Sequence, residues 1–93
     1  MKRKTANNID AILKERGQRY GKFKNHAEIS QKLKAVLWEF DYQRMEYNQI
    51  EALEMICHKM ARILNGDPDY SDSWNDIAGY SKLVADRLDG VAK

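Results

Sequence analysis

The chain has 93 residues and a mass of 10.9 kDa, with 43% hydrophobic and 32% charged residues. These values predict one domain, residues 1–93, and exclude a two-domain enzyme, because no residues remain for a second hydrophobic core. The longest apolar run, Ala35–Trp38, is far too short to cross a bilayer, and the basic start Met1–Lys4 is not followed by the apolar stretch of an export signal. We therefore expect a cytoplasmic protein that does not associate with membranes.

The net charge of +2 conceals an uneven distribution of charged residues. Residues 1–34 carry ten Lys or Arg and three Asp or Glu, whereas residues 35–93 carry six and eleven. Either the amino-terminal part faces an anion or nucleic acid, or the chain neutralises itself across its own helices. The single cysteine, Cys57, excludes an internal disulfide and a thiolate zinc site and fits a reducing compartment.

Apolar residues recur at spacings of three and four, and no run alternates apolar and polar residues. We therefore expect an all-α fold, a compact antiparallel bundle of about four helices. Residues 1–7 are expected to be a disordered basic tail. A first helix is predicted from Asn8 to Arg16, ending at Gly17. The loop 17–24 then carries Tyr20 and Phe23, which either fill the core or face a ligand.

The second helix is predicted from Asn25 to Met45, because Asn25 and Glu28 form a capping-box pattern. One apolar stripe predicts its core face and consists of Ile29, Leu33, Val36, Leu37 and Phe40. Trp38, Tyr42 and Met45 form a second stripe on the other side. A helix with two apolar stripes needs two neighbours, so this second stripe packs against another helix of the chain or another protomer.

The third helix is predicted from Asn48, where Asn48 and Glu51 repeat the capping-box pattern, to Asn65, with Gly66 as a left-handed cap. Its core face is expected to consist of Leu53, Ile56, Cys57, Met60, Ile63 and Leu64. The fourth helix is predicted from Ser71 or Asp72 to Asp89. Its core face is expected to consist of Trp74, Ile77, Ala78, Ser81, Val84, Ala85 and Leu88. Gly79, Tyr80 and Leu83 lie on its polar side, which indicates that a ligand or another helix approaches there. A glycine that the helix tolerates without any such role explains Gly79 equally well.

Four carboxylates of the third and fourth helices have the spacing of a shared site. Glu51 and Glu54 share one helical stripe with His58, and Asp72 lies one turn from Asp76. If the two stripes face each other, the carboxylates converge on a site that suits Mg²⁺. Each acid also has an ordinary role as a cap, a salt-bridge partner or a solvated surface residue, and spacing alone leaves both interpretations open.

The segment Glu51-Ala-Leu-Glu54, followed by a second acidic helix, resembles the paired Glu-x-x-Glu and Glu-x-x-Asp motifs of the all-α MazG-like nucleoside triphosphate pyrophosphohydrolases. Asp76 matches the last carboxylate of the second motif. Ser73 stands where its first carboxylate is expected, and Asp72 is adjacent. The resemblance implies a Mg²⁺-dependent hydrolase.

Three further segments resemble small, largely uncharacterised phage and prophage proteins. They are Arg-Gly-x-Arg-Tyr-Gly at 16–21, Ala-Arg-Ile-Leu-Asn-Gly-Asp at 61–67 and Asp-Ser-Trp-x-Asp-Ile-Ala-Gly-Tyr at 72–80. This likeness covers about residues 8–89. It implies a phage-derived protein connected with nucleotides, in the cytoplasm of the host cell.

We therefore expect a Mg²⁺-dependent nucleotide-binding phage protein that acts as a MazG-like (deoxy)nucleoside triphosphate pyrophosphohydrolase. The expected metal ligands are Glu51, Glu54, Asp72 and Asp76, with Glu54 catalytic. Cations are expected to hold the phosphates and an aromatic ring to stack on the base. The expected nucleotide-binding residues are Arg19, Lys22, His58, Lys59, Arg62, Trp74 and Tyr80.

The alternative is a non-enzymatic phage protein that binds a host or defence protein or sequesters a signalling nucleotide. In either case we expect a homo-oligomer whose interface contains Trp38, Tyr42, Met45 and Leu83, because a small bundle gains by burying such faces. Nucleic-acid binding through the basic loop is less favoured, since the acidic second half repels a long polyanion.

Overall fold

The computed structural model describes residues 4–40 and 42–91. They form four α-helices and a short 3₁₀-helix, in the order α1 Lys4–Tyr20, α2 Phe23–Glu39, η1 Tyr42–Arg44, α3 Tyr47–Asn65 and α4 Ser71–Leu88. No strand occurs in these two ranges. The predicted all-α fold of about four helices is therefore confirmed.

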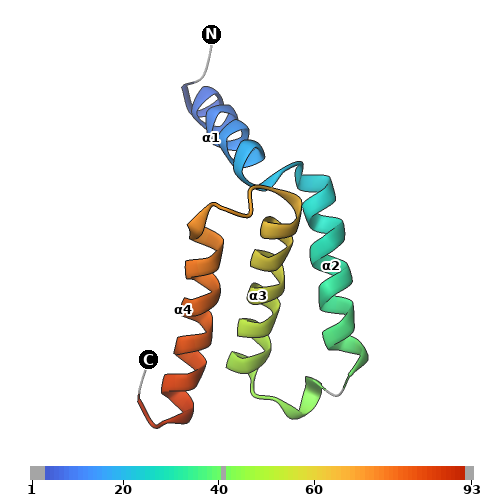
Figure 1. Cartoon of the computed structure of the whole chain (residues 1–93), viewed down its shortest axis with the longest axis vertical. Helices are drawn as coiled ribbons and strands as arrows, with labels where there is room; N and C mark the ends of the chain where they lie inside the picture. Colours follow the sequence, from blue (N-terminus) through green and yellow to red (C-terminus); the bar gives the residue numbers. More distant parts are fainter. Residues whose placement is uncertain (1–3, 41, 92–93) are drawn as a thin grey trace.

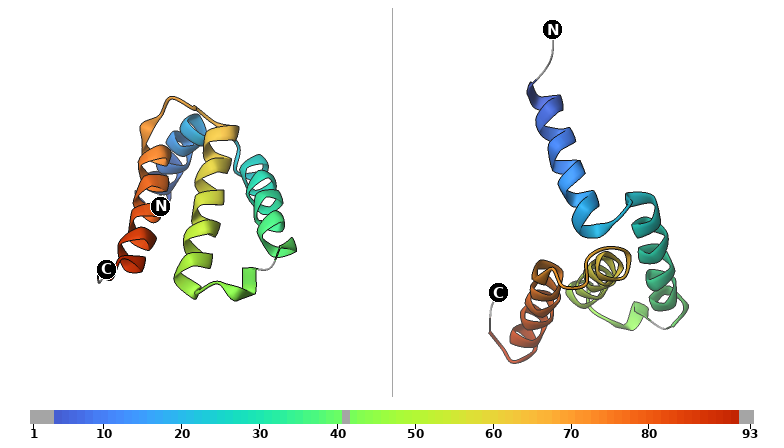
Figure 2. Two further views of the ribbon diagram at one scale, coloured as in Figure 1. Left: turned by 60° about the horizontal axis from the view of Figure 1, so that its bottom comes forward. Right: turned by 45° about the horizontal axis from the view of Figure 1, so that its top comes forward.

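α3 is the central helix of a layer of three (Figure 1). α2 and α4 pack along opposite sides of α3, and each runs antiparallel to it. α1 projects away from this layer, as the right-hand view of Figure 2 shows, and has few contacts with α2 and α3. One end of the layer therefore brings together α1, the start of α2 and the last turns of α3.

The chain reverses direction at Gly21 and not at Gly17, where the first helix was predicted to end. α1 continues through Gly17 to Tyr20 and begins at Lys4 rather than Asn8; residues 1–3 of the predicted tail lie outside the described residues. A glycine inside a helix costs only about 1 kcal/mol relative to alanine, so Gly17 does not end the helix. Gly21 has φ +79°, the left-handed conformation that closes a helix, and its N–H donates to the Gly17 carbonyl at 2.9 Å.

α2 begins and ends earlier than predicted. Because Lys22 is extended and the helix starts at Phe23, the predicted capping box of Asn25 and Glu28 does not start the helix. Glu28 instead accepts a hydrogen bond from Lys32, one turn along α2, at 2.8 Å. After Glu39 the chain becomes extended and then forms η1, so the predicted continuation to Met45 is wrong.

α3 begins at Tyr47, so its capping box lies two residues earlier than predicted. Glu46 is the N-cap, and its backbone N–H donates to Oε1 of Gln49 at 2.9 Å. α3 ends at Asn65 and α4 runs from Ser71 to Leu88, close to the predicted bounds. The predicted left-handed cap is wrong, because φ of Gly66 is −123°.

The interior of the described chain is built from small and polar side chains. The buried apolar residues are Ala52, Cys57 and Ala61 of α3, and the buried polar residues are His26, Ser30 and Ser73. Small side chains allow α2 and α4 to approach α3 closely. Predicted core residues that the structure leaves exposed are Val36, Phe40, Met60, Leu64, Trp74, Ala78, Ser81, Ala85 and Leu88. The cause in α2 is its rotation, which turns His26 and Ser30 towards α3.

The chain exposes more surface than a compact monomer of its mass. Its accessible area is 7225 Å², whereas a folded monomer of 10.9 kDa is expected to expose about 5,600 Å². The radius of gyration is 16.1 Å, against about 12 Å for a compact domain of this length. On α1, which projects from the layer, Ile9, Ile12 and Leu13 are about half exposed.

Among the described residues, the structure contains no helix with the length and apolar character needed to cross a membrane.

Candidate functional site

The turn between α1 and α2 is fastened to the end of α3. The side-chain amide of Asn65 donates to the carbonyls of Tyr20 at 2.8 Å and Lys22 at 3.0 Å, and the N–H of Asp67 donates to the carbonyl of Arg19 at 2.7 Å. A Cβ on Gly66 would collide with the backbone of Arg19 and Tyr20. The first two segments of the phage-protein resemblance, 16–21 and 61–67, are therefore in direct contact.

Stacked cations and rings reinforce this junction. The guanidinium of Arg62 lies 4.1 Å from the ring centroid of Tyr20, and that of Arg19 lies 4.2 Å from the ring centroid of Tyr70. The two tyrosine rings are 6.1 Å apart. Arg19 therefore makes a structural contact with Tyr70 at the edge of the junction. Arg62 stacks on Tyr20 and also lines a pocket.

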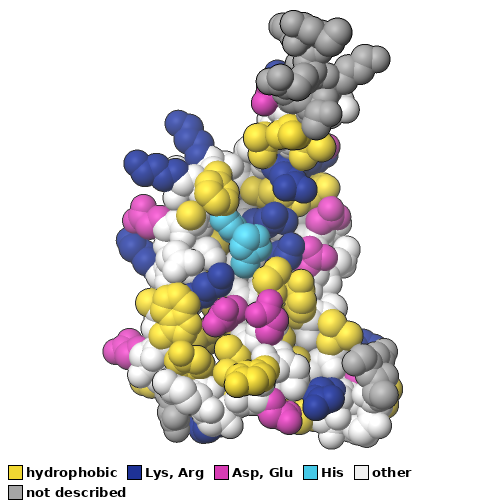
Figure 3. Space-filling model, turned by 180° about the vertical axis from the view of Figure 1, so that it is seen from behind, with side chains coloured by type: hydrophobic (Ala, Val, Ile, Leu, Met, Phe, Trp, Pro, Cys, Tyr) yellow, Lys and Arg dark blue, Asp and Glu magenta, His cyan; other side chains and the backbone are white. Residues whose placement is uncertain are grey.

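A pocket of about 530 Å³ opens where α1, the α1–α2 turn and α3 meet. Its cationic side chains are those of Arg16, Lys22 and Arg62, and its rings are those of Tyr20, Phe23, His26 and His58. Figure 3 shows the histidines on this face with Lys and Arg side chains around them. Within the described ranges, none of the three cations forms an ion pair with a carboxylate. The pocket therefore has an uncompensated positive charge beside aromatic surface. We call it the junction pocket.

Two histidines form a hydrogen-bonded pair in the junction pocket. Nε2 of His26 lies 3.3 Å from Nδ1 of His58, and the rings meet edge to face with centroids 4.5 Å apart. Burial is the main cause that lowers the pKa of both imidazoles, that of His58 to about 4, and the positive charge of Arg62 adds to the effect. Both rings are therefore uncharged near neutral pH.

The four carboxylates expected to bind a metal do not converge in this chain. Glu54 accepts a hydrogen bond from Nε1 of Trp38 at 3.4 Å, on the side of α2, whereas Asp76 forms a 3.0 Å ion pair with Lys59, between α3 and α4. Asp72 lies beside Tyr70 and accepts its hydroxyl hydrogen bond, which raises the pKa of Tyr70. Glu51 lines a groove between α3 and α4. In the described part of the chain, no group of three or more His, Cys, Asp or Glu side chains could hold a metal ion.

The expected nucleotide-binding residues are divided between several places. Lys22, His58 and Arg62 meet in the junction pocket. The indole N–H of Trp74 donates to the carbonyl of Pro68 at 2.9 Å. Lys59 is held by Asp76, and Tyr80 lies on α4 away from the junction.

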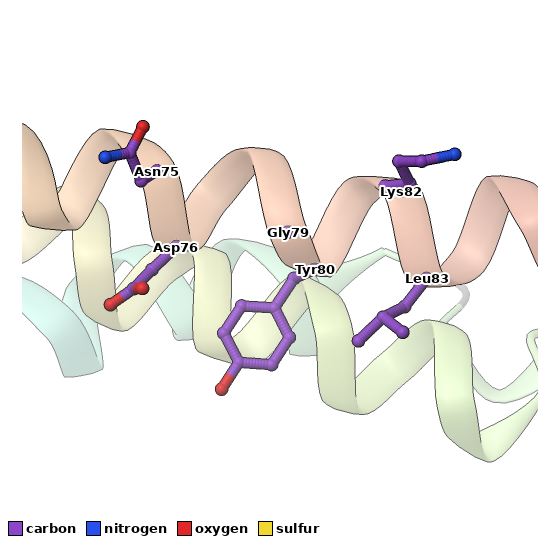
Figure 4. A pocket seen from close by; sticks show the side chains of 6 residues that line it. All are labelled: Asn75, Asp76, Gly79, Tyr80, Lys82 and Leu83. Carbon is purple, nitrogen blue, oxygen red and sulfur yellow. The ribbon is translucent and has the colours of Figure 1, made fainter. Parts of the chain in front are cut away.

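α4 carries a second, shallower pocket of about 510 Å³ (Figure 4). Asp76, Tyr80 and Leu83 point to one side of α4, and Asn75 and Lys82 point away from them. A Cβ on Gly79 would meet nothing within 4 Å, so neighbouring helices do not require glycine there.

The expected interface residues lie at two separate places. Trp38 is 44% exposed on α2, with Tyr42 and Met45 half-buried near η1. Leu83 is 49% exposed on α4, on the opposite side of α3.

Sequence reasoning missed His26 and the pairing of the two histidines. The only signal was that His26 shares the α2 stripe of Ser30, Leu33 and Leu37, spaced by four, three and four residues. A polar residue in such a stripe indicates a buried polar contact, but not its partner 32 residues away.

No curated protein and no solved structure matches the chain. Residues 4–88 match the family described as a domain of unknown function, DUF6378. Since this match covers all four helices, the chain belongs to the DUF6378 family.

Proposed function

We propose that this protein binds a nucleotide, with the phosphates in the junction pocket. The observation that carries the proposal is the set of three cations, Arg16, Lys22 and Arg62, which line the pocket without carboxylate partners among the described residues. Such side chains form strong charge-assisted hydrogen bonds to phosphate oxygens. A pocket of about 530 Å³ is within the range of small-molecule sites.

The aromatic rings of the pocket complement the base of a nucleotide. Phe23 is 79% exposed at the start of α2, next to Lys22, and so offers a free ring face. Stacking of a base on an aromatic side chain is worth about 1–3 kcal/mol and tolerates different bases. The junction pocket therefore supports recognition of the phosphates more strongly than recognition of one particular base.

Hydrolysis of a triphosphate is a separate proposal, drawn from the resemblance to MazG-like enzymes. Glu54 supports it, because this residue lies one helical turn from His58 on α3. As arranged in the described chain, Glu54, Asp72 and Asp76 have different partners, Glu51 lines a groove, and the four carboxylates do not form a magnesium site. Whether turnover depends on Mg²⁺ is measured in the assay below.

The test combines binding with turnover. Purified protein is titrated with ribo- and deoxynucleoside triphosphates by calorimetry, with Mg²⁺ or with a chelator, and monophosphate and pyrophosphate are followed by chromatography. Lys22→Met should weaken binding about tenfold or more, because a charge-assisted hydrogen bond is worth about 1.5–3 kcal/mol. Lys24→Met removes the same charge two residues away, outside the pocket, and should change affinity little. Equal affinities of the two variants would refute the proposed pocket.

Self-association is part of the proposal, with a second copy of the chain as the partner. The support is the surface excess of roughly 1,600 Å² over a compact monomer, whereas a standard interface buries about 800 Å² on each partner. The half-exposed apolar residues of α1 and the predicted interface residues Trp38, Tyr42, Met45 and Leu83 are candidates for burial.

The alternative is a non-enzymatic phage protein that binds a host or defence protein or sequesters a signalling nucleotide in the host cytoplasm. The divergent carboxylates favour it over catalysis. Nucleotide binding without release of pyrophosphate would support the sequestering form of this alternative.

A further inference from the structure

The junction pocket contains a feature that phosphate binding by cations alone does not explain. His26 comes from the first turn of α2 and His58 from α3, and 3.3 Å separates Nε2 of the first from Nδ1 of the second. The shared hydrogen bond uses these two nitrogens. Nε2 of His58 has no hydrogen-bond partner in the described chain. The sequence contains two histidines, so every imidazole that can titrate belongs to this pair.

The pair has a buried nitrogen with no partner. His26 is 6% exposed, and its Nδ1 makes no hydrogen bond among the described residues. An unsatisfied buried polar atom costs about 1–3 kcal/mol, and such atoms are rare enough in native proteins to need a functional or structural explanation. An apolar side chain would fill this position without that cost. The histidine therefore indicates a role beyond packing.

Positive charge reaches the pair from all the elements around it. Arg16 of α1, Lys22 of the turn and Arg62 of α3 line the same pocket. Lys34 of α2 and Lys59 of α3 also disfavour a charged imidazole. Of these five cations, only Lys59 has an acidic partner in the described chain, Asp76 of α4. The empty pocket therefore keeps the pair neutral through burial and charge repulsion.

We propose that the His26–His58 pair is a proton-accepting subsite for a phosphate dianion. In this arrangement Nδ1–H of His58 donates to Nε2 of His26, so Nε2 of His58 carries no hydrogen. When the dianion binds beside Arg62, this nitrogen takes up one proton from solvent and donates a hydrogen bond to a phosphate oxygen. This inference rests on the proposed function, because it requires an anion in the junction pocket. The subsite would favour a terminal phosphate or pyrophosphate over a carboxylate, since a doubly charged group attracts a proton to the imidazole more strongly than a singly charged one.

The electrostatic reason is that the bound anion offsets part of the local positive charge and places a negative charge close to the imidazole. An opposite charge within about 4–6 Å raises the pKa of a basic group by about 1–3. Linkage then requires proton uptake on binding at a pH between the pKa of the free pair and that of the complex. In this range the affinity for the anion should rise up to tenfold for each pH unit by which the pH falls, and it should level off below the pKa of free His58, about 4.

The experiment measures the imidazole pKa values by NMR in the full-length chain. The probe is sulfate, a dianion whose own charge does not change in this pH range, and chloride at equal ionic strength is the control. The pKa of His58 should rise from about 4 in chloride to about 5 or higher in sulfate. Lys22→Met should reduce this rise, and Lys24→Met should leave it unchanged.

The outcomes separate the inference from the proposed function. Sulfate-induced shifts of the Lys22 and Arg62 amide signals with unchanged imidazole pKa values would overturn the inference and leave the pocket intact. If neither sulfate nor a nucleoside triphosphate shifts these signals, both the inference and the proposed function fail.

In His58→Asn the side-chain amide can keep a hydrogen bond to His26, and the affinity for sulfate should lose its pH dependence. A retained pH dependence would overturn the inference. His26→Gln offers a second variant if His58→Asn does not fold.

Discussion

Gly66 lies against the backbone of Tyr20 so closely that no side chain fits between them. Tyr20 is the last residue of α1, and Gly66 follows the last residue of α3. The direct contact of these two backbones, together with the two hydrogen bonds from Asn65, holds the turn whose residues Tyr20, Gly21 and Lys22 line the junction pocket.

Gly66→Ala should therefore destabilise the protein. The added Cβ would collide with the backbone of Arg19 and Tyr20, which cannot move aside like a flexible side chain, and overpacking of this kind costs about 1–3 kcal/mol. Gly79→Ala is the matched control, because it adds a methyl group to open space inside a helix and should stabilise by about 0.4–1 kcal/mol. Urea unfolding of both variants measures the difference. Equal stabilities would contradict the close contact.

The ion pair of Lys59 and Asp76 should contribute to the packing of α4 on α3. The Lys59 side chain is 11% exposed and that of Asp76 is 47% exposed, so Asp76→Asn leaves a nearly buried ammonium without its counterion. We expect a loss of about 1–2 kcal/mol in the free energy of unfolding, less than for a fully buried pair because solvent reaches Asp76. Asp69→Asn, at an exposed position in the α3–α4 turn, is the control. No difference between the two variants in urea unfolding would refute this role.

Stability should fall as the solution becomes acidic. The folded-state pKa of His58, about 4, lies below its ordinary value of 6.5, so the unfolded chain binds this proton more tightly. The contribution of the neutral ring is complete above pH 6.5 and is lost as the pH falls towards 4. With allowance for solvent screening, we expect a loss of about 2 kcal/mol, measured as a lower urea midpoint. In His58→Asn the loss should be smaller, and an unchanged pH dependence would contradict the assignment.

Magnesium alone should not stabilise the free chain. The carboxylate of Glu54 accepts a hydrogen bond from Trp38, and that of Asp76 pairs with Lys59. The two carboxylates therefore do not form a cluster of oxygen ligands for the ion. The unfolding temperature should be the same in Mg²⁺ and in chelator at equal ionic strength. An increase of several degrees in Mg²⁺, absent in Glu54→Gln, would show that the carboxylates do converge.

Light scattering at micromolar concentration should give a mass above the 10.9 kDa of one chain. Ile12→Asp on α1 and Leu83→Asp on α4 place a charge in two different apolar surfaces, and the variant that restores the mass of one chain locates the interface. Lys14→Glu, on the polar side of α1, is the control. A single-chain mass for the unaltered protein would refute self-association.

The sequence predicted the number of helices and the bounds of α4, because Pro68 and Gly90 lie just outside that helix. It did not predict which of two glycines reverses the chain after α1. Gly17 and Gly21 are equivalent in local pattern, and the choice of Gly21 depends on Asn65, which is far away in the chain but adjacent in space.

The site was predicted in part for a similar reason. Three residues of the expected nucleotide-binding set, Lys22, His58 and Arg62, line one pocket. The expected convergence of Glu54 and Asp76 depended on the rotation of α3 between its two neighbours. Residue spacing defines the stripes of a helix but not which neighbour each stripe faces, and the same uncertainty concealed the pairing of His26 with His58.

The rate at which Cys57 reacts with a thiol reagent can report how often the helices packed on α3 separate. Cys57 is the sole thiol of the sequence, it is buried in α3, and burial raises its pKa. An uncharged alkylating reagent can therefore reach it only when the helices packed on α3 separate. The modification rate, measured with and without a nucleotide, would show how strongly a ligand at one end of the layer restrains the motion of the whole molecule.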